Sequence, residues 1–168
     1  MSLRFSNTLV NLLKFKNNFD WQNKMSSKNS EIFPPNFRSH RTRNFGMNPE
    51  KNILVVEDDP ASQSILTRLL KTRGYSVCTA SNGHQAMAVT ARKNPKLALV
   101  DVVLPEVSGL DFLKWLRANH PGIRVIMLSV LEEESTVAHE ARALGVYDYF
   151  RKPPDFSDLL TRVDQAMF

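Results

Sequence analysis

Side chains that can bind cations or phosphate stand at the ends of four short apolar runs in this sequence. They comprise carboxylates, one hydroxyl and one amine, namely Glu57, Asp58, Asp59, Asp101, Ser129 and Lys152. The carboxyl ends of parallel strands meet at one edge of a sheet, so these groups are expected to converge there. Together they can hold a divalent cation and accept a phosphoryl group.

The acidic cluster Glu57-Asp58-Asp59 requires a counter-charge. Two like charges about 4 Å apart repel by about 4 kcal/mol at an effective dielectric near 20, and Asp101 adds to this repulsion. Mg²⁺ is the ion expected first, because it is a hard, octahedral cation that takes carboxylate, water and phosphate oxygens. Asp59 is interpreted instead as a helix cap. A solvated surface is the weaker explanation for Glu57 and Asp58, because they leave a buried strand.

Asp101 is the candidate nucleophile. Attack of an aspartate on phosphorus gives an acyl phosphate, and phosphoryl transfer needs mainly alignment and charge neutralisation. The Lys152 ammonium would supply that charge, and a cis bond to Pro153 could turn it inward. The Ser129 hydroxyl could donate to a phosphoryl oxygen. The structural alternatives are a solvated lysine and a serine that belongs to a turn.

From residue 52 onward, strand-like and helix-like segments alternate. Strands are predicted at residues 53–56, 75–80, 97–101, 124–129 and 146–150. Helices are predicted from Pro60 to a stop at Gly74, at 83–93, at 110–119, from the glutamates 132–134 to near Gly145, and at 156–167. Because three of the strands are continuously apolar, the predicted fold class is α/β, a doubly wound parallel (βα)5 sheet with helices on both faces.

Charge is unevenly distributed along the chain. Of the 168 residues, 1–46 hold eight Lys or Arg against two acids, a net charge of +6, whereas the remainder carries −1. Residues 1–48 are therefore predicted to be a basic, mostly disordered leader and linker, and residues 49–168 a single domain. A short amphipathic helix within 3–19, an organellar transit peptide, and a later start at Met25 or Met47 stay open.

Composition argues against a disulfide-stabilised protein and against a membrane-spanning one. The single cysteine, Cys78, cannot form an intramolecular disulfide and suits a reducing compartment, so a cytoplasmic location is predicted. No run approaches the roughly 18 apolar residues of a membrane span. The basic leader can attract nucleic-acid phosphates, but it contains no recognisable element for reading bases.

Four stretches of the sequence match the motifs of one family. They are Ile-Leu-Val-Val-Glu-Asp-Asp (53–59), Leu-Val-Asp-Val-Val-Leu-Pro-Glu-Val-Ser-Gly (99–109), Val-Ile-Met-Leu-Ser (125–129) and Tyr-Phe-Arg-Lys-Pro (149–153). Each is weak alone, but all four in this order and spacing are highly specific. On these stretches, residues 52–168 resemble the receiver domain of two-component response regulators. The resemblance implies the flavodoxin-like strand order 2-1-3-4-5.

The resemblance implies a role for each site residue. Glu57, Asp58 and Asp101 would bind Mg²⁺ together with the backbone carbonyl of Val103. Asp101 would be phosphorylated by a phosphohistidine of a sensor histidine kinase or a histidine phosphotransfer protein. Lys152 would bind the phosphate.

A switch is also implied by the resemblance. Ser129 would be the switch hydroxyl and Tyr149 the switch aromatic. New charge on Asp101 would draw Ser129 toward it, and Tyr149 would turn into the space that opens. This movement repacks the target-binding face formed by the fourth helix, fifth strand and fifth helix. The alternative is that Tyr149 only packs on an edge strand.

The sequence departs from the family pattern beside the site. Val130 replaces a residue that is usually small and narrows access to Asp101, while Ser129 replaces the commoner threonine and keeps the hydroxyl. Val103 and Leu131 are apolar, so neither side chain can orient an attacking water. We therefore expect slow hydrolysis of the phosphorylated form.

Three other functions compete with that of a phosphorylated receiver. An aspartate-nucleophile phosphatase would need a second acid at the position of Val103, and a nucleotide-binding protein would need a glycine-rich loop after the first strand. A receiver-like interaction module that is not phosphorylated stays the alternative. The predicted protein is a stand-alone phosphorelay receiver and not an enzyme beyond self-phosphotransfer and autodephosphorylation. Its expected partners are the phosphodonor, an unknown target and a transient second copy, with no DNA-binding domain and no membrane span.

Overall fold

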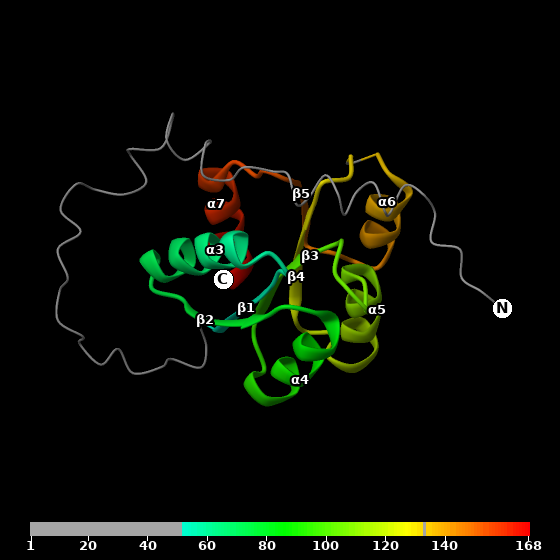
Figure 1. The fold of residues 1–168 in the computed structure, drawn as a ribbon, viewed down its shortest axis with the longest axis horizontal. Coiled ribbons are helices and arrows are strands. Elements are labelled where there is room, and N and C mark those ends of the chain that lie inside the picture. The colour runs from blue at the N-terminus through cyan, green and yellow to red at the C-terminus, as the bar shows by residue number, and fades with distance from the viewer. Residues whose placement is uncertain (1–51, 133) are drawn as a thin grey trace. The chain divides into compact units, whose positions relative to one another are not determined.

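Three continuous apolar runs form the centre of a parallel sheet. The computed structural model describes residues 52–132 and 134–168. Five strands pair in parallel in the order 2-1-3-4-5 (Figure 1): β1 (Asn52–Val56), β2 (Ser76–Ala80), β3 (Leu97–Asp101), β4 (Arg124–Ser129) and β5 (Asp148–Arg151). The predicted fold class and strand order are confirmed.

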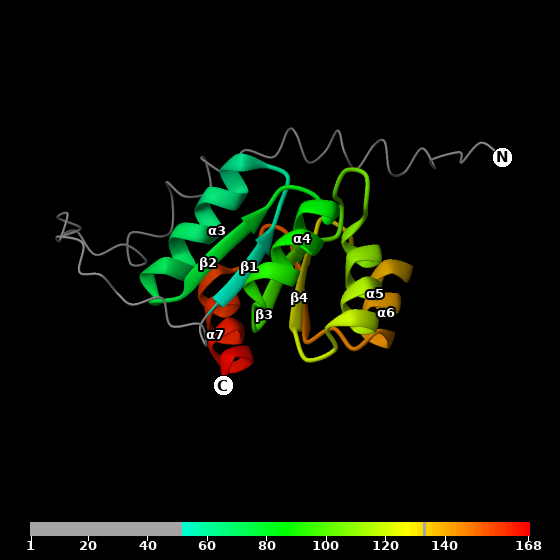
Figure 2. The same cartoon turned by 90° about the horizontal axis from the view of Figure 1, so that it is seen from below.

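Helices cover both faces of this sheet. One face carries α3 (Pro60–Thr72) and α7 (Phe156–Met167). The other carries α4 (Gly83–Lys93), α5 (Gly109–Asn119) and α6 (Thr136–Ala143), as Figure 2 also shows. Each of these helices is preceded by a capping residue whose side-chain oxygen accepts a backbone N–H of the first turn: Asp59, Asn82, Ser108, Ser135 and Asp155. Such a cap stabilises a helix by about 1 kcal/mol.

The central strands are buried on both faces, as their apolar sequences require. Alternate residues of β1, β3 and β4 join one cluster with α4, α5 and α6: Leu54, Val56, Ala98, Val100, Val125 and Met127. The residues between them are also buried, and successive side chains of a strand point to opposite faces. They therefore face α3 and α7, where Leu66, Leu70, Leu159 and Val163 are buried.

Several predicted boundaries are wrong. β1 and α5 each start one residue earlier than predicted, and β5 ends one residue later. Three further starts are wrong because a local hydrogen bond defines the start of the element. The helix expected from residue 132 begins at Thr136, because Ser135 is its N-cap. The Ser135 N–H donates to the Glu132 carbonyl, so the backbone forms a separate turn before the helix. β5 begins at Asp148, since the Val146 N–H donates to Ala141 at the end of α6. β2 begins after Tyr75, whose N–H donates to Leu70 of α3.

Several predictions lie outside the described residues. They are the disordered leader at 1–48, the amphipathic helix within 3–19, the alternative starts and the boundary before residue 49. Within the described residues, no helix combines the length and apolar character needed to cross a bilayer.

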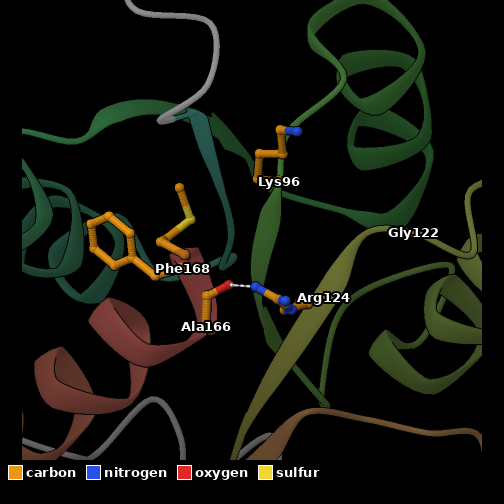
Figure 3. A pocket seen from close by; sticks show the side chains of 6 residues that line it. Lys96, Gly122, Arg124, Ala166 and Phe168 are labelled. Carbon is orange, nitrogen blue, oxygen red and sulfur yellow. Dashed lines mark hydrogen bonds between the residues drawn. The ribbon is translucent and has the colours of Figure 1, made fainter.

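A hollow at the amino ends of the strands lies away from the predicted site. Its lining includes Lys96, just before β3, and Arg124, the first residue of β4. Figure 3 shows the Arg124 guanidinium donating to the carbonyl of Ala166 in the last turn of α7. A cation at this position stabilises the negative end of the helix dipole. The contact therefore explains Arg124 as a structural residue of α7.

Tyr75 ties the edge of the sheet to α7. Its phenol is buried and donates to Asp164 Oδ1 at 2.6 Å, and Arg73 donates to Oδ2 of the same carboxylate at 3.0 Å. Burial and this hydrogen bond raise the pKa of the Tyr75 phenol well above its usual value. We expect Tyr75→Phe to lower the free energy of unfolding by about 1 kcal/mol, the typical contribution of such a bond. Urea unfolding will measure it, and an unchanged midpoint would contradict the assignment.

Candidate functional site

The predicted polar groups do gather at the carboxyl edge of the sheet. Glu57 follows β1, Asp101 and Ser129 are the last residues of β3 and β4, and Lys152 follows β5. Glu57, Asp101 and Ser129 are buried, with 1%, 2% and 0% of their surfaces exposed. These strands lie apart in the sequence, so the parallel topology brings the groups together.

Lys152 connects two of the carboxylates. Its Nζ donates to Glu57 Oε2 at 2.5 Å and to Asp101 Oδ2 at 2.7 Å. The ammonium side chain is only 5% exposed, so water screens these ion pairs weakly. The peptide bond between Lys152 and Pro153 is cis, as the sequence suggested. Lys152 is therefore part of the site and not a solvated surface lysine.

Three carboxylates lie close enough together to hold a metal ion. One oxygen from each of Glu57, Asp58 and Asp101 lies within 4.8 Å of the others. The single ammonium of Lys152 leaves a formal excess of two negative charges among these four side chains, which a divalent cation would balance. Hard oxygen donors of this kind suit Mg²⁺. Asp59 stands apart from the set, because it caps α3 by accepting from the Ser62 N–H at 2.7 Å, as predicted.

The loop after Asp101 is held close to the strand end. The Val103 N–H donates to Asp101 Oδ1 at 2.8 Å, and the Gly109 N–H donates to the Val102 carbonyl at 3.0 Å. A Cβ on Gly109 would lie 2.0 Å from the Asp101 carbonyl oxygen, so only glycine permits this approach. The loop therefore fixes both the position of α5 and the orientation of the Asp101 carboxylate.

Ser129 and Tyr149 lie inside the domain, beside this edge. The Ser129 hydroxyl accepts the Leu131 N–H at 3.0 Å, and its carbonyl accepts the Lys152 N–H at 2.6 Å. Tyr149 is 5% exposed, with the Arg142 guanidinium 5.7 Å from its ring centroid. Burial raises the pKa of the Tyr149 phenol, although the nearby Ser129 and Ser135 hydroxyls oppose that rise. Among the described residues, no group makes a well-aligned hydrogen bond to this phenol oxygen.

The residues that depart from the family pattern follow Asp101 and Ser129 along the chain and are partly or fully buried. Val130 and Leu131 are half-buried and pack against the cluster under α4, α5 and α6. Val103 belongs to that cluster and is 5% exposed. Apolar residues therefore follow both Asp101 and Ser129 along the chain, and their side chains pack with the core cluster.

Sequence reasoning missed one polar residue beside the site. Gln63 on α3 donates from Nε2 to the backbone carbonyls of Glu57 and Ala80, at 2.8 and 3.1 Å. The only sequence signal was its place in the first turns of the helix that follows the acidic cluster, within an otherwise amphipathic pattern.

Curated relatives of this chain include regulators of transcription. The chain is 33% identical over 112 residues to the probable transcriptional regulatory protein TcrX of Mycobacterium tuberculosis, covering 66% of this chain and 47% of that protein. It is 37% identical to the transcriptional regulatory protein ZraR of Salmonella typhimurium, over 69% of this chain and 26% of the relative. It is 32% identical to the acid tolerance regulatory protein ActR of Rhizobium meliloti, over 70% of this chain and 60% of that protein. The chain thus spans between about a quarter and three fifths of these relatives.

These relatives correct the predicted partners. The sequence led us to expect a stand-alone receiver with an unnamed target protein and no DNA-binding domain. That expectation is wrong as a description of the group, because TcrX and ZraR are named transcriptional regulatory proteins and the match covers only part of each relative. The physical reason is that the motifs at the sheet edge define the receiver and carry no information about the domains joined to it.

Solved structures and a family model agree on the rest. A CheY-like receiver domain from Methanospirillum hungatei superposes with a TM-score of 0.67 at 27% identity, over 70% of this chain and 93% of the other. A response regulator receiver protein from Pseudomonas putida superposes with a TM-score of 0.64 at 29% identity, over 68% of this chain and 95% of the other. The model of the response regulator receiver domain matches residues 53–164, the segment that builds the sheet and its acidic edge. This chain belongs to the response regulator receiver family.

Proposed function

We propose that this receiver is a Mg²⁺-dependent phosphorylation switch whose phosphoryl acceptor is Asp101. The observation that carries the proposal is the contact of the Lys152 ammonium with both Glu57 and Asp101, beside Asp58. A buried carboxylate next to a fixed cation and further metal ligands has what phosphoryl transfer needs, namely alignment and charge neutralisation.

The proposed donor is a phosphohistidine of a sensor histidine kinase or a histidine phosphotransfer protein. An Asp101 carboxylate oxygen attacks the phosphorus, the P–N bond breaks with its electron pair going to the imidazole, and the imidazole keeps or takes up a proton. The product is an acyl phosphate on Asp101. Lys152 is already within 2.7 Å of the carboxylate and would neutralise charge on the phosphoryl oxygens.

Glu57, Asp58, Asp101 and the Val103 carbonyl would hold the Mg²⁺. When bound, the ion supplies charge stabilisation for the phosphoryl oxygens and balances the excess negative charge of the carboxylates. Lys152 pairs with two of the same carboxylates, so its ammonium shares with the ion the task of neutralising this edge.

The proposed response uses Ser129 and Tyr149. A new phosphoryl group on Asp101 would recruit the Ser129 hydroxyl, which now accepts from Leu131. Loss of that bond would loosen the loop that leads to α6, and Tyr149 would repack under Arg142. The target would then bind the face formed by α6, β5 and α7. The free thiol of Cys78 suits the cytoplasm as the setting, and we propose no enzymatic activity beyond self-phosphotransfer and autodephosphorylation.

Uptake of phosphate from a small donor tests this function. The full chain should gain one phosphoryl group from acetyl phosphate and Mg²⁺, seen as an acid-stable, hydroxylamine-labile mass increase. EDTA should suppress the gain. A chain that takes up nothing under these conditions would favour the alternative, a receiver-like interaction module that is not phosphorylated.

The lifetime of the phosphorylated form tests the role of the apolar border. Val103 gives an attacking water no hydrogen-bond partner, so we expect Val103→Asn to shorten the lifetime on the order of tenfold, within the range that positioning of a reactant provides. Decay of the labelled protein after removal of the donor measures it. Val107→Asn, the same change on the same loop, serves as control. Equal lifetimes of wild type and Val103→Asn would contradict the account.

A further inference from the structure

The Gln63 amide holds the backbone of Glu57, the first of the three clustered carboxylates, in place. Its Nε2 donates to the Glu57 carbonyl at 2.8 Å and to the Ala80 carbonyl at 3.1 Å. The Glu57 N–H donates to the same Ala80 carbonyl at 3.0 Å. The peptide groups on both sides of Glu57 are thus fixed to the end of β2, by one backbone bond and one side chain.

This arrangement matters because both oxygens of the Glu57 carboxylate already accept hydrogen bonds. One of its oxygens accepts from Lys152 at 2.5 Å and the other accepts the Asp59 N–H at 3.2 Å. The residue is 1% exposed and cannot relax into solvent. A shift of its backbone would therefore move the carboxylate relative to Asp58 and Asp101.

We propose that Gln63 is a positioning residue of the cation site and sets its affinity for Mg²⁺ without touching the ion. This inference rests on the proposed function, since it assumes that Mg²⁺ binds Glu57, Asp58 and Asp101. Groups that orient metal ligands typically change metal affinity by about 10- to 100-fold when removed. Gln63 acts through the Glu57 main chain and not through its carboxylate.

Two substitutions separate positioning from simple electrostatics. Gln63→Met keeps the length of the side chain and removes both donors. Gln63→Glu keeps the shape, faces the two carbonyls with oxygens, and adds a negative charge near the cation. If charge alone governed affinity, Gln63→Glu would bind Mg²⁺ more tightly. If positioning governs, both variants bind it more weakly.

The matched control is Gln85 on α4. Its Oε1 accepts from the Ser81 N–H at 2.6 Å and the Ser81 hydroxyl at 3.0 Å, so Gln85→Met removes an amide from a neighbouring loop at the same edge. The hydrogen bonds of the Gln85 amide thus lead to Ser81 and not to the carboxylate cluster. The Gln85→Met variant should bind Mg²⁺ with the same affinity as the wild type.

The experiment titrates the full chain and each variant with MgCl₂ and monitors binding by the NMR chemical shifts of backbone amides. Each titration is carried out below the midpoint temperature of unfolding of the protein concerned. We expect the Mg²⁺ dissociation constant to rise roughly tenfold in Gln63→Met, to rise in Gln63→Glu, and to stay constant in Gln85→Met.

An unchanged dissociation constant in Gln63→Met, or a lower one in Gln63→Glu, overturns the inference. If Gln63→Met does not fold, the dissociation constant of Gln63→Glu decides alone. Failure of the wild type to bind Mg²⁺ overturns the metal site itself, which distinguishes the two failures.

Discussion

Replacing Lys152 with methionine lowers the free energy of unfolding of the full chain by about 3 kcal/mol in EDTA, the cost of removing one partner of a buried ion pair. Glu57 and Asp101 would then lie next to Asp58 without the ammonium that now contacts them at 2.5 and 2.7 Å. Addition of Mg²⁺ should restore part of the stability, because a ligand that binds only the folded state stabilises it by mass action. Urea unfolding with and without Mg²⁺ measures both effects.

The same variant should be labelled by acetyl phosphate roughly a hundredfold more slowly, as when one group that stabilises developing charge is removed. Lys114→Met is the matched control. Lys114 also pairs with a carboxylate, Glu140, at 2.8 Å, but on an exposed surface where such a pair contributes little. If Lys152→Met and Lys114→Met gave the same stability in EDTA and the same labelling rate, Lys152 would have no part in the site.

Asp101→Asn should reduce labelling by at least about a thousandfold, since loss of a nucleophile is among the largest single effects in enzymes. The fold should survive, because the asparagine amide oxygen can still accept the Val103 N–H that Asp101 Oδ1 accepts at 2.8 Å. Removal of one carboxylate also relieves repulsion with Glu57 and Asp58. Radiolabel uptake and thermal unfolding, measured on the same sample, separate chemistry from stability.

Asp111→Asn controls for the loss of an aspartate near the start of a helix. Asp111 is exposed on α5 and accepts from the Ser108 hydroxyl at 2.7 Å, and it is not one of the three clustered carboxylates. Its labelling should equal that of the wild type. Labelling of Asp101→Asn at the wild-type rate would mean that another residue accepts the phosphoryl group.

Where apolar patterning and caps coincide, the sequence predicted the structure well. β3 and β4 have the predicted bounds because their runs are continuously apolar and end in the polar residues of the site. The bounds of α4 and α7 also match. The start of α6 does not, because negative charge at 132–134 suggested a helix dipole, whereas the backbone turns once more before Ser135 caps the helix.

The site could be predicted at the level of the sheet edge but not at the level of atoms. Strand ends placed Asp101, Ser129 and Lys152 together, because parallel topology fixes which ends meet. That Lys152 reaches Glu57 as well as Asp101 depends on side-chain directions across 95 positions of sequence. Gln63 could not be foreseen, since its contact with Ala80 depends on how closely α3 packs against the end of β2.

Mapping the phosphoryl group tests the central claim most directly. The full chain, treated with acetyl phosphate and Mg²⁺, is reduced with borohydride, which converts an aspartyl phosphate into homoserine, and its peptides are sequenced by mass spectrometry. We expect conversion at Asp101 and none when EDTA replaces Mg²⁺. Conversion at another aspartate, or equal conversion of Asp101 in EDTA, would contradict that claim.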